Sequence, residues 1–225
     1  IRETRAQGGS GFPVSVKLNS SDFQKGGFSP AECLQVARWL DDAGVDLLEV
    51  SGGSYEQPAM MDIDGLEARY EETKRESTRA REAYFLTYAE EIRAAARMPL
   101  MVTGGFRTKA GMEAAVSSGA CDVVGVGRPL CVDPDLPKRL FSGEATTAPS
   151  YEKTMRIGPG VFGPNSNIDI LKALNGFAIM SFFYDNIERL ADGRATRERM
   201  MLLPAFVRQQ LNETRKAKSL HRNYK

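Results

Sequence analysis

Short apolar runs alternate with amphipathic segments through the first two thirds of the chain. Four runs are bounded by Gly, Pro or polar residues and have the composition of strands: PVSVKL (13–18), VDLLEV (45–50), PLMVT (99–103) and CDVVGV (121–126). Apolar residues recur at helical spacing in four further segments: 30–44, 83–96, 109–119 and 133–143. Strands that alternate with helices form a parallel sheet covered by helices. The pattern therefore predicts an α/β fold of four βα units.

The first predicted helix has the clearest boundaries. Ser29 is a suitable N-cap, Pro30 suits the first helical position, and Gly44 is a typical stop signal. The apolar face between these signals is made of Cys33, Val36, Ala37 and Leu40. We expect a helix that begins at Pro30 and is closed by Gly44.

The chain divides into three predicted parts. Residues 1–142 carry the βα units, residues 143–152 (GEATTAPSYE) have the composition of a linker, and residues 153–225 contain two amphipathic helical segments. We expect these segments to form a C-terminal helical extension that packs on the sheet unit. Three helix-breaking residues are expected to interrupt them: Gly176, Gly193 and Pro204.

Two stretches depart from this regular pattern. Residues 62–82 alternate in charge and have no apolar face, so we expect a solvated excursion. The chain opens at Ile1 with IRETRAQGGSGFP, which resembles the end of a helix followed by a turn. We therefore expect the sequence to be a piece of a longer protein.

Composition narrows the classes of function. The 225 residues are 42% hydrophobic, enough for one sizeable core, and the net charge of +1 gives no reason to expect a nucleic-acid or anionic membrane partner. No apolar run approaches the ~18 residues of a membrane span. Cys33, Cys121 and Cys131 lack metal-ligand spacing, and no metal site is predicted. We expect Cys33 and Cys121 to be buried free thiols in a reducing, cytoplasmic setting.

Two of the predicted strands end in the same way, with glycine and then arginine. MVTGGFRT contains Gly104, Gly105 and Arg107, and VVGVGRPL contains Gly127 and Arg128. Glycine allows close backbone approach and exposes N–H donors, and arginine matches a phosphate dianion. In βα barrels the loops after the last two strands form the usual phosphate site. The doubled turn predicts a phosphate site, and tight turns with surface arginines are the alternative.

Lys17 stands inside an apolar strand, between Val16 and Leu18. A charge at such a position is expensive to bury. Two interpretations are open: a lysine at the mouth of a barrel facing an anionic group, or an outward-pointing lysine on an edge strand.

Four segments together resemble a known family. VSVKLNSSDF, DLLEVSGGSYEQP, PLMVTGGFRT and DVVGVGRPLCVDPDLPKRL, in this order, are similar to the second half of the old yellow enzyme family. The subgroup of 2,4-dienoyl-CoA reductase-like and fungal NADH:flavin oxidoreductases is the most similar. The resemblance implies the C-terminal half of a (β/α)8 TIM barrel, FMN as cofactor, and NADH or NADPH as reductant. It further implies hydride transfer to a small-molecule acceptor such as an activated alkene.

The resemblance implies roles for matching positions. Lys17 matches the basic residue of the fifth strand, beside flavin N1 and the C2 carbonyl. Gly104, Gly105 and Arg107 match the turn under the FMN phosphate. Gly127 and Arg128 match the next turn, which completes the phosphate site. No role is assigned to the loop after the sixth strand, which contains Ser51, Gly52, Gly53 and Tyr55.

The family's substrate-orienting His pair and its proton-donating Tyr come from the first barrel half, and no residue here matches them. The single histidine, His221, is expected to be a solvated tail residue. The catalytic residues are therefore unknown, and two alternatives stay open. One is a noncatalytic FMN- or phosphate-binding half-barrel that self-associates through its open strand edges. The other is a different phosphate-binding barrel enzyme with a phosphosugar substrate.

Overall fold

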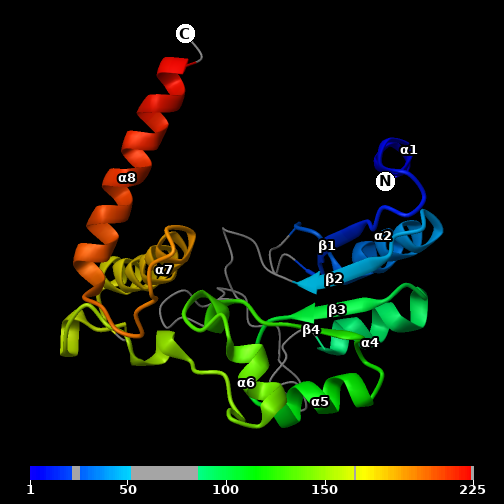
Figure 1. The fold of residues 1–225 in the computed structure, drawn as a ribbon, viewed down its shortest axis with the longest axis horizontal. Coiled ribbons are helices and arrows are strands. Elements are labelled where there is room, and N and C mark those ends of the chain that lie inside the picture. The colour runs from blue at the N-terminus through cyan, green and yellow to red at the C-terminus, as the bar shows by residue number, and fades with distance from the viewer. Residues whose placement is uncertain (22–25, 52–85, 165, 224–225) are drawn as a thin grey trace. The chain divides into compact units, whose positions relative to one another are not determined.

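The computed structural model describes residues 1–21, 26–51, 86–164 and 166–223 (Figure 1). Its elements follow the predicted order: α1 Arg2–Gly8, β1 Ser15–Asn19, α2 Pro30–Asp42, β2 Leu47–Ser51, α4 Leu86–Ala95, β3 Leu100–Thr103, α5 Lys109–Ser117, β4 Val123–Gly125, η2 Arg128–Cys131, α6 Leu136–Ser142, η3 Tyr151–Thr154, η4 Gly160–Phe162, α7 Asp169–Ala191 and α8 Leu202–Asn223, where η denotes a short 3-10 turn. The expected excursion at 62–82 lies outside the described residues. One compact unit comprises the described residues of 1–127 and 139–148, and a second comprises those of 128–138 and 149–223.

The first unit is built on a four-stranded sheet in the order β1-β2-β3-β4, and every neighbouring pair is parallel (Figure 1). Sequential parallel strands with intervening helices are the arrangement of a βα barrel segment. The predicted α/β class with four βα units is therefore confirmed.

One face of this sheet packs against helices. The buried residues of β2 and β3 on that face join a single apolar cluster with residues of α2, α4 and α5. The strand residues that are fully buried there are Leu48, Val50, Leu100 and Val102. Val16 and Leu18 of β1 pack against the same cluster. Because side chains alternate along a strand, Lys17, Glu49 and Met101 lie on the opposite face, the one that a closed barrel encloses.

Helix α2 begins and ends where the sequence predicts. Ser29 Oγ accepts a hydrogen bond from the Glu32 backbone N–H at 3.3 Å, and the Glu32 carboxylate accepts one from Ser29 N–H at 2.8 Å. This is a reciprocal capping box. The carboxylate accepts from Ser29 N–H and also from the Ser29 hydroxyl at 2.7 Å, and these two bonds lower the pKa of Glu32. After the helix, Gly44 adopts a left-handed φ of 72° that favours glycine.

Asp122 joins β3, β4 and α4 just before β4 begins. Its carboxylate accepts a hydrogen bond from Leu100 N–H at 2.7 Å and forms an ion pair with Arg93. The Arg93 hydrogen bond, followed by that from Leu100, holds the pKa of Asp122 below its usual value of 3.8.

Cys33 and Cys121 are buried free thiols, as predicted. Burial raises the pKa of Cys33 to about 11. Desolvation also raises the pKa of Cys121, with a smaller contribution from neighbouring Asp122. No helix in the described part of the chain is both long and apolar enough to cross a membrane.

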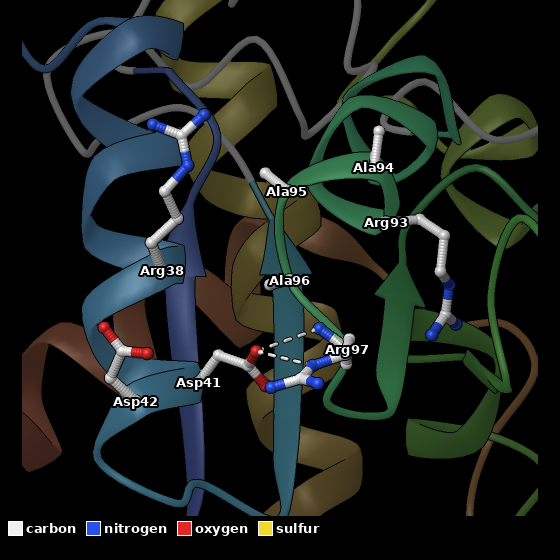
Figure 2. Close-up of a pocket in the computed structure, with 8 residues that line it drawn as sticks. All are labelled: Arg38, Asp41, Asp42, Arg93, Ala94, Ala95, Ala96 and Arg97. Carbon is white, nitrogen blue, oxygen red and sulfur yellow. Dashed lines mark hydrogen bonds and ion pairs between the residues drawn. The ribbon is translucent and has the colours of Figure 1, made fainter.

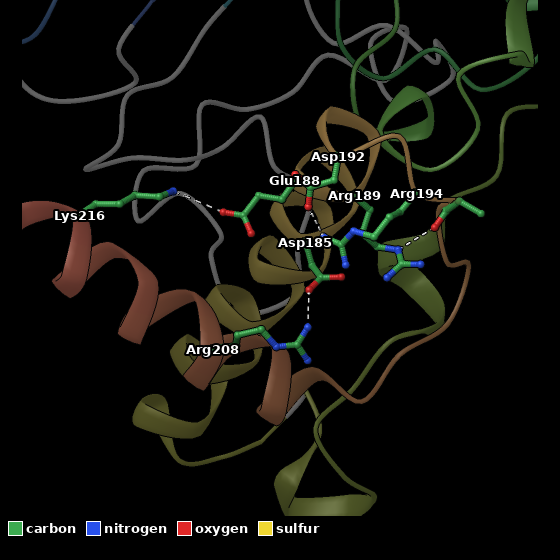
Figure 3. A network of polar contacts seen from close by, with 8 residues as sticks. Asp185, Glu188, Arg189, Asp192, Arg194, Arg208 and Lys216 are labelled. Carbon is green, nitrogen blue, oxygen red and sulfur yellow. Dashed lines mark hydrogen bonds and ion pairs between the residues drawn. The ribbon is translucent and has the colours of Figure 1, made fainter.

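The second unit contains two long helices, α7 and α8, which pack against each other. Its apolar interior includes Ala178, Ile179, Phe182 and Phe183 of α7 and Leu202 and Ala205 of α8. Figure 3 shows ion pairs that link the two helices at their surface: Asp185 with Arg208 at 2.9 Å and Glu188 with Lys216 at 3.4 Å.

Two of the three expected interruptions of these helices are wrong. Gly176 lies buried within α7, which continues to Ala191, because the packing of its apolar face outweighs the cost of about 1 kcal/mol for a helical glycine. Pro204 lies in the first turn of α8, where its missing N–H would have no helical partner. Only Gly193, with a φ of 68°, follows a helix end as predicted.

Two buried asparagines of α7 hold the loops of this unit. Asn175 Oδ1 accepts from Ile157 N–H at 3.0 Å, and its Nδ2 donates to the Phe162 carbonyl at 3.1 Å. Asn186 Oδ1 accepts from Arg197 N–H at 2.7 Å, and its Nδ2 donates to the Arg197 carbonyl at 3.1 Å. Each amide therefore pairs with two backbone groups of a neighbouring loop.

Candidate functional site

The four strands end at one edge of the sheet, because all of them are parallel. Their last residues are Asn19, Ser51, Thr103 and Gly125. Ser51 is buried, and its Oγ lies 3.2 Å from Asn19 Oδ1. Ligands of parallel-sheet proteins bind at such carboxyl edges, so this edge is the candidate site.

The turn after β3 depends on two glycines. Gly104 has a φ of 119° and Gly105 a φ of 82°, values that other residues rarely adopt. Phe106, 2% exposed, anchors the turn in the apolar cluster, and Arg107 follows it. The Arg107 guanidinium donates to the Phe106 carbonyl at 2.9 Å. The turn thus presents a left-handed glycine backbone and a cation at the carboxyl edge.

A segment well downstream braces this turn. Ala148 N–H donates to the Arg107 carbonyl at 2.6 Å, and Lys109 N–H donates to the Thr146 carbonyl at 2.9 Å. Thr108 also caps α5, its Oγ1 accepting from Gly111 N–H at 3.0 Å. The backbone between Arg107 and Lys109 is therefore held on both sides.

Thr103 and Gly125 lie directly opposite each other on β3 and β4. A Cβ placed on Gly125 would lie 1.9 Å from Thr103 Oγ1 and 2.8 Å from the Met101 methyl group, so no larger residue fits. Thr103 Oγ1 is buried and has no hydrogen-bond partner among the described residues. A buried hydroxyl without a partner is unusual in a native protein and requires an explanation.

Gly127 differs from Gly125. A Cβ placed there would meet no atom within 4 Å, and its φ is outside the left-handed region. Neither packing nor backbone conformation in the described structure requires a glycine here. A ligand that approaches the backbone closely would explain why residue 127 is a glycine.

Arg128 belongs to the second unit, where it begins η2. Its guanidinium forms an ion pair with the carboxylate of Glu152 at 3.1 Å; the side chains are 20% and 2% exposed. Glu152 lies in the segment that the sequence suggested as a linker, and sequence reasoning missed it. No pattern around SYEKT in the sequence indicates this partner.

Lys17 forms a second ion pair that sequence reasoning missed. Its Nζ lies 2.8 Å from Glu49 Oε1, and the two residues face each other in the register of β1 and β2. The sequence did contain a signal for this pair. The consecutive strands SVKLN and LLEVS each have one charged residue at the third position, and the two charges are opposite.

A polar hollow lies elsewhere in the described part of the chain. It has a volume of 380 Å³ and is lined by side chains from the last turns of α2 and α4 (Figure 2). Among its lining residues, Asp41 accepts hydrogen bonds from Arg97 N–H at 3.2 Å and Met98 N–H at 2.9 Å. These residues precede β2 and β3, so the hollow lies at the amino ends of the strands, away from the candidate site.

The first unit can therefore offer a phosphate or a polar cofactor several donors at its carboxyl edge. They are the left-handed glycine turn with Arg107 and the buried hydroxyl of Thr103, beside the open space next to the Gly127 Cα. Such a set fits the phosphate and polar edges of a flavin nucleotide, since glycine turns and arginine bind anions.

Sequence comparison finds a matching family. The model of the NADH:flavin oxidoreductase / NADH oxidase family matches residues 1–147. The NADH-dependent flavin oxidoreductase iliE of Neonectria sp. (strain DH2) is 39% identical over 139 residues, 61% of this chain and 18% of that protein. The NADH-dependent flavin oxidoreductase iccE of Talaromyces variabilis is 38% identical over 141 residues, 62% of this chain and 33% of that protein. The chain thus spans about a fifth to a third of the length of these relatives.

Structural comparison gives the same fold. A 2-naphthoyl-CoA reductase, solved in complex with 2-naphthoyl-CoA, superposes with a TM-score of 0.52 at 24% identity. The match covers 64% of this chain and 20% of that one. Together with the parallel sheet, it agrees with part of a TIM barrel.

Proposed function

Because the chain belongs to the NADH:flavin oxidoreductase / NADH oxidase family, we propose that it carries the flavin-phosphate-binding part of an FMN-dependent NAD(P)H oxidoreductase. Bound FMN would supply hydride transfer from NADH or NADPH to a small-molecule acceptor, an activated alkene by family resemblance. The observation that carries the proposal is the pair of glycine turns on neighbouring strands. One turn requires glycine for its backbone, and the other has a glycine that the described packing does not require.

In this proposal the residues have different roles in binding the phosphate. Gly104, Gly105 and Gly127 let backbone N–H groups approach the phosphate, and Arg107 neutralises its charge. Arg128, which follows Gly127 directly, is proposed as a second cation. A guanidinium is planar and carries five N–H donors, which suit it to phosphate recognition.

Lys17 is proposed to face the flavin ring. Its strand position places it on the inner face of the sheet, two residues before the carboxyl edge. Two residues of strand span about 6.6 Å, a distance that the extended lysine side chain covers. A cation there would stabilise negative charge that develops on the ring system during reduction.

The proposal also covers the cellular compartment and the binding partners of the protein. We place the protein in the cytoplasm, where buried free thiols such as Cys33 and Cys121 stay reduced. We propose no nucleic-acid partner, and we propose self-association as a way of covering the edges of β1 and β4, the outer strands of the described sheet.

Gly127→Ala tests the site directly. The substitution introduces no clash and no backbone strain, so the free energy of unfolding should change by less than about 0.5 kcal/mol. A phosphate that contacts this backbone would be displaced, so FMN affinity should fall at least tenfold, whereas riboflavin, which has no phosphate, should bind as before. Fluorescence titration with both flavins measures this. Equal effects on FMN and riboflavin would refute the phosphate assignment.

A further inference from the structure

The ion pair between Lys17 and Glu49 brings a negative charge to the inner face of the sheet. The two side chains are held by a hydrogen bond of 2.8 Å between Nζ and Oε1. They come from adjacent strands at the same register position, so each backbone fixes the location of its partner. The contact is therefore built into the sheet and does not depend on a mobile loop.

The two members of the pair differ in exposure. The Glu49 side chain is 22% exposed and the Lys17 side chain is 57% exposed. A largely covered carboxylate needs a counter-charge. Lys17 supplies that counter-charge, and its remaining exposed surface is available to a ligand on the same face.

The ion pair changes the electrostatic field that acts on a bound ligand. A lone lysine presents a full positive charge, whereas an ion pair presents a dipole whose field falls off faster with distance. At the inner face of a barrel, where screening by water is weak, this difference is larger than at an open surface.

We propose that Glu49 is a positioning residue that sets the reduction potential of bound FMN through Lys17. The inference rests on the proposed function and extends it. Glu49 holds the ammonium group in place and offsets its charge, so the cofactor gains less stabilisation on reduction than a lone lysine would give. Glu49 thereby keeps the midpoint potential lower than Lys17 alone would set it.

Glu49→Gln separates the two contributions. Glutamine retains the size of the side chain and an oxygen that accepts from Lys17 Nζ, but it removes the negative charge. The midpoint potential should rise by at least the equivalent of a tenfold change in the ratio of reduced to oxidised FMN affinity, about 30 mV for two electrons. Lys17→Met should lower the potential. Glu144→Gln is the matched control, because Glu144 forms a pair of similar length, 2.9 Å, with Arg139 in the same unit.

The test is a spectroelectrochemical titration of the FMN-loaded protein and these three variants. An unchanged or lower potential in Glu49→Gln, with FMN still bound by the wild type, would overturn the inference and leave the proposed function standing. A rise of the same size in Glu144→Gln would also overturn it. Failure of the wild type to bind FMN would refute the proposed function, and the inference would fall with it.

Discussion

Arg128 and Glu152 form an ion pair, with 3.1 Å between guanidinium nitrogen and carboxylate oxygen and only 2% of the Glu152 side chain exposed. The pair joins a residue of the glycine–arginine turn to a residue beyond the part of the chain that the family model matches. Arg128 thus has a structural role in the second unit.

Arg128→Ala should therefore destabilise the protein. It leaves the Glu152 carboxylate buried without this partner, and breaking such a pair from one side costs about 3–5 kcal/mol. Urea unfolding measures the loss. Lys216→Ala is the control, because its pairs with Glu188 and Glu213 are exposed and worth less than about 1 kcal/mol. Equal small losses in both variants would show that the Arg128 pair contributes little.

Asn186→Ala should destabilise the second unit through its loops. The substitution leaves both the N–H and the carbonyl of Arg197 without their amide partner. Both bonds are part-buried and Arg197 is exposed, so water replaces part of what is lost, and we expect a loss of about 1–2 kcal/mol. Asn212→Ala, on the less buried part of α8, should cost less than about 1 kcal/mol. A loss in Asn186→Ala as small as the control's would contradict this assignment.

Asp122 should contribute to stability in a defined pH range. Its pKa is lowered in the folded state by Arg93 and by Leu100 N–H. As the pH falls, the carboxyl group of Asp122 therefore binds its proton at a higher pH in the unfolded chain than in the folded chain. The contribution is fully present above the usual pKa of 3.8 and is lost as the pH falls further, through the folded-state pKa.

Asp122→Asn should thus reduce stability at neutral pH and make the remaining stability less dependent on pH below about 4. Thermal unfolding followed between neutral and acidic pH measures both effects. An acid-side slope that is the same in wild type and variant would show that Asp122 does not titrate as its contacts imply.

The 225-residue chain by itself should show no NAD(P)H-dependent reduction of an enone. The family's substrate-orienting histidines have no match in this sequence, whose only histidine is His221 on α8. The groups that orient the substrate and donate the proton would then be missing. Anaerobic stopped-flow with added FMN measures turnover, and free FMN at the same concentration provides the background. Enone turnover above that background would show that the catalytic residues lie in this chain.

Much of the fold follows from local patterns in the sequence. The capping signals at Ser29 and Pro30 and the alternation in LLEVS act over a few residues, so α2 and β2 could be predicted. Gly176 and Pro204 were misjudged because their effects depend on packing and on position within a helix. Propensity alone does not give either of these.

The site was predictable to a smaller extent. The glycine–arginine turns are visible as motifs, and the structure gives Gly104 and Gly105 the backbone that only glycine adopts readily. The partners of the cations were not visible. Glu49 lies 32 residues from Lys17, and Glu152 lies outside the motif-bearing region, so only the folded structure pairs them.

The central claim is that this chain binds the phosphate of FMN at the carboxyl edge of its sheet. Phosphorus NMR of FMN with the protein tests it most directly, because it reports on the phosphate itself. A free phosphate monoester loses its second proton near pH 6, and a site with arginine and backbone N–H donors favours the dianion. The account predicts a shifted bound resonance that stays constant as the pH crosses about 6. A resonance identical to that of free FMN, titrating at the same pH, would contradict it.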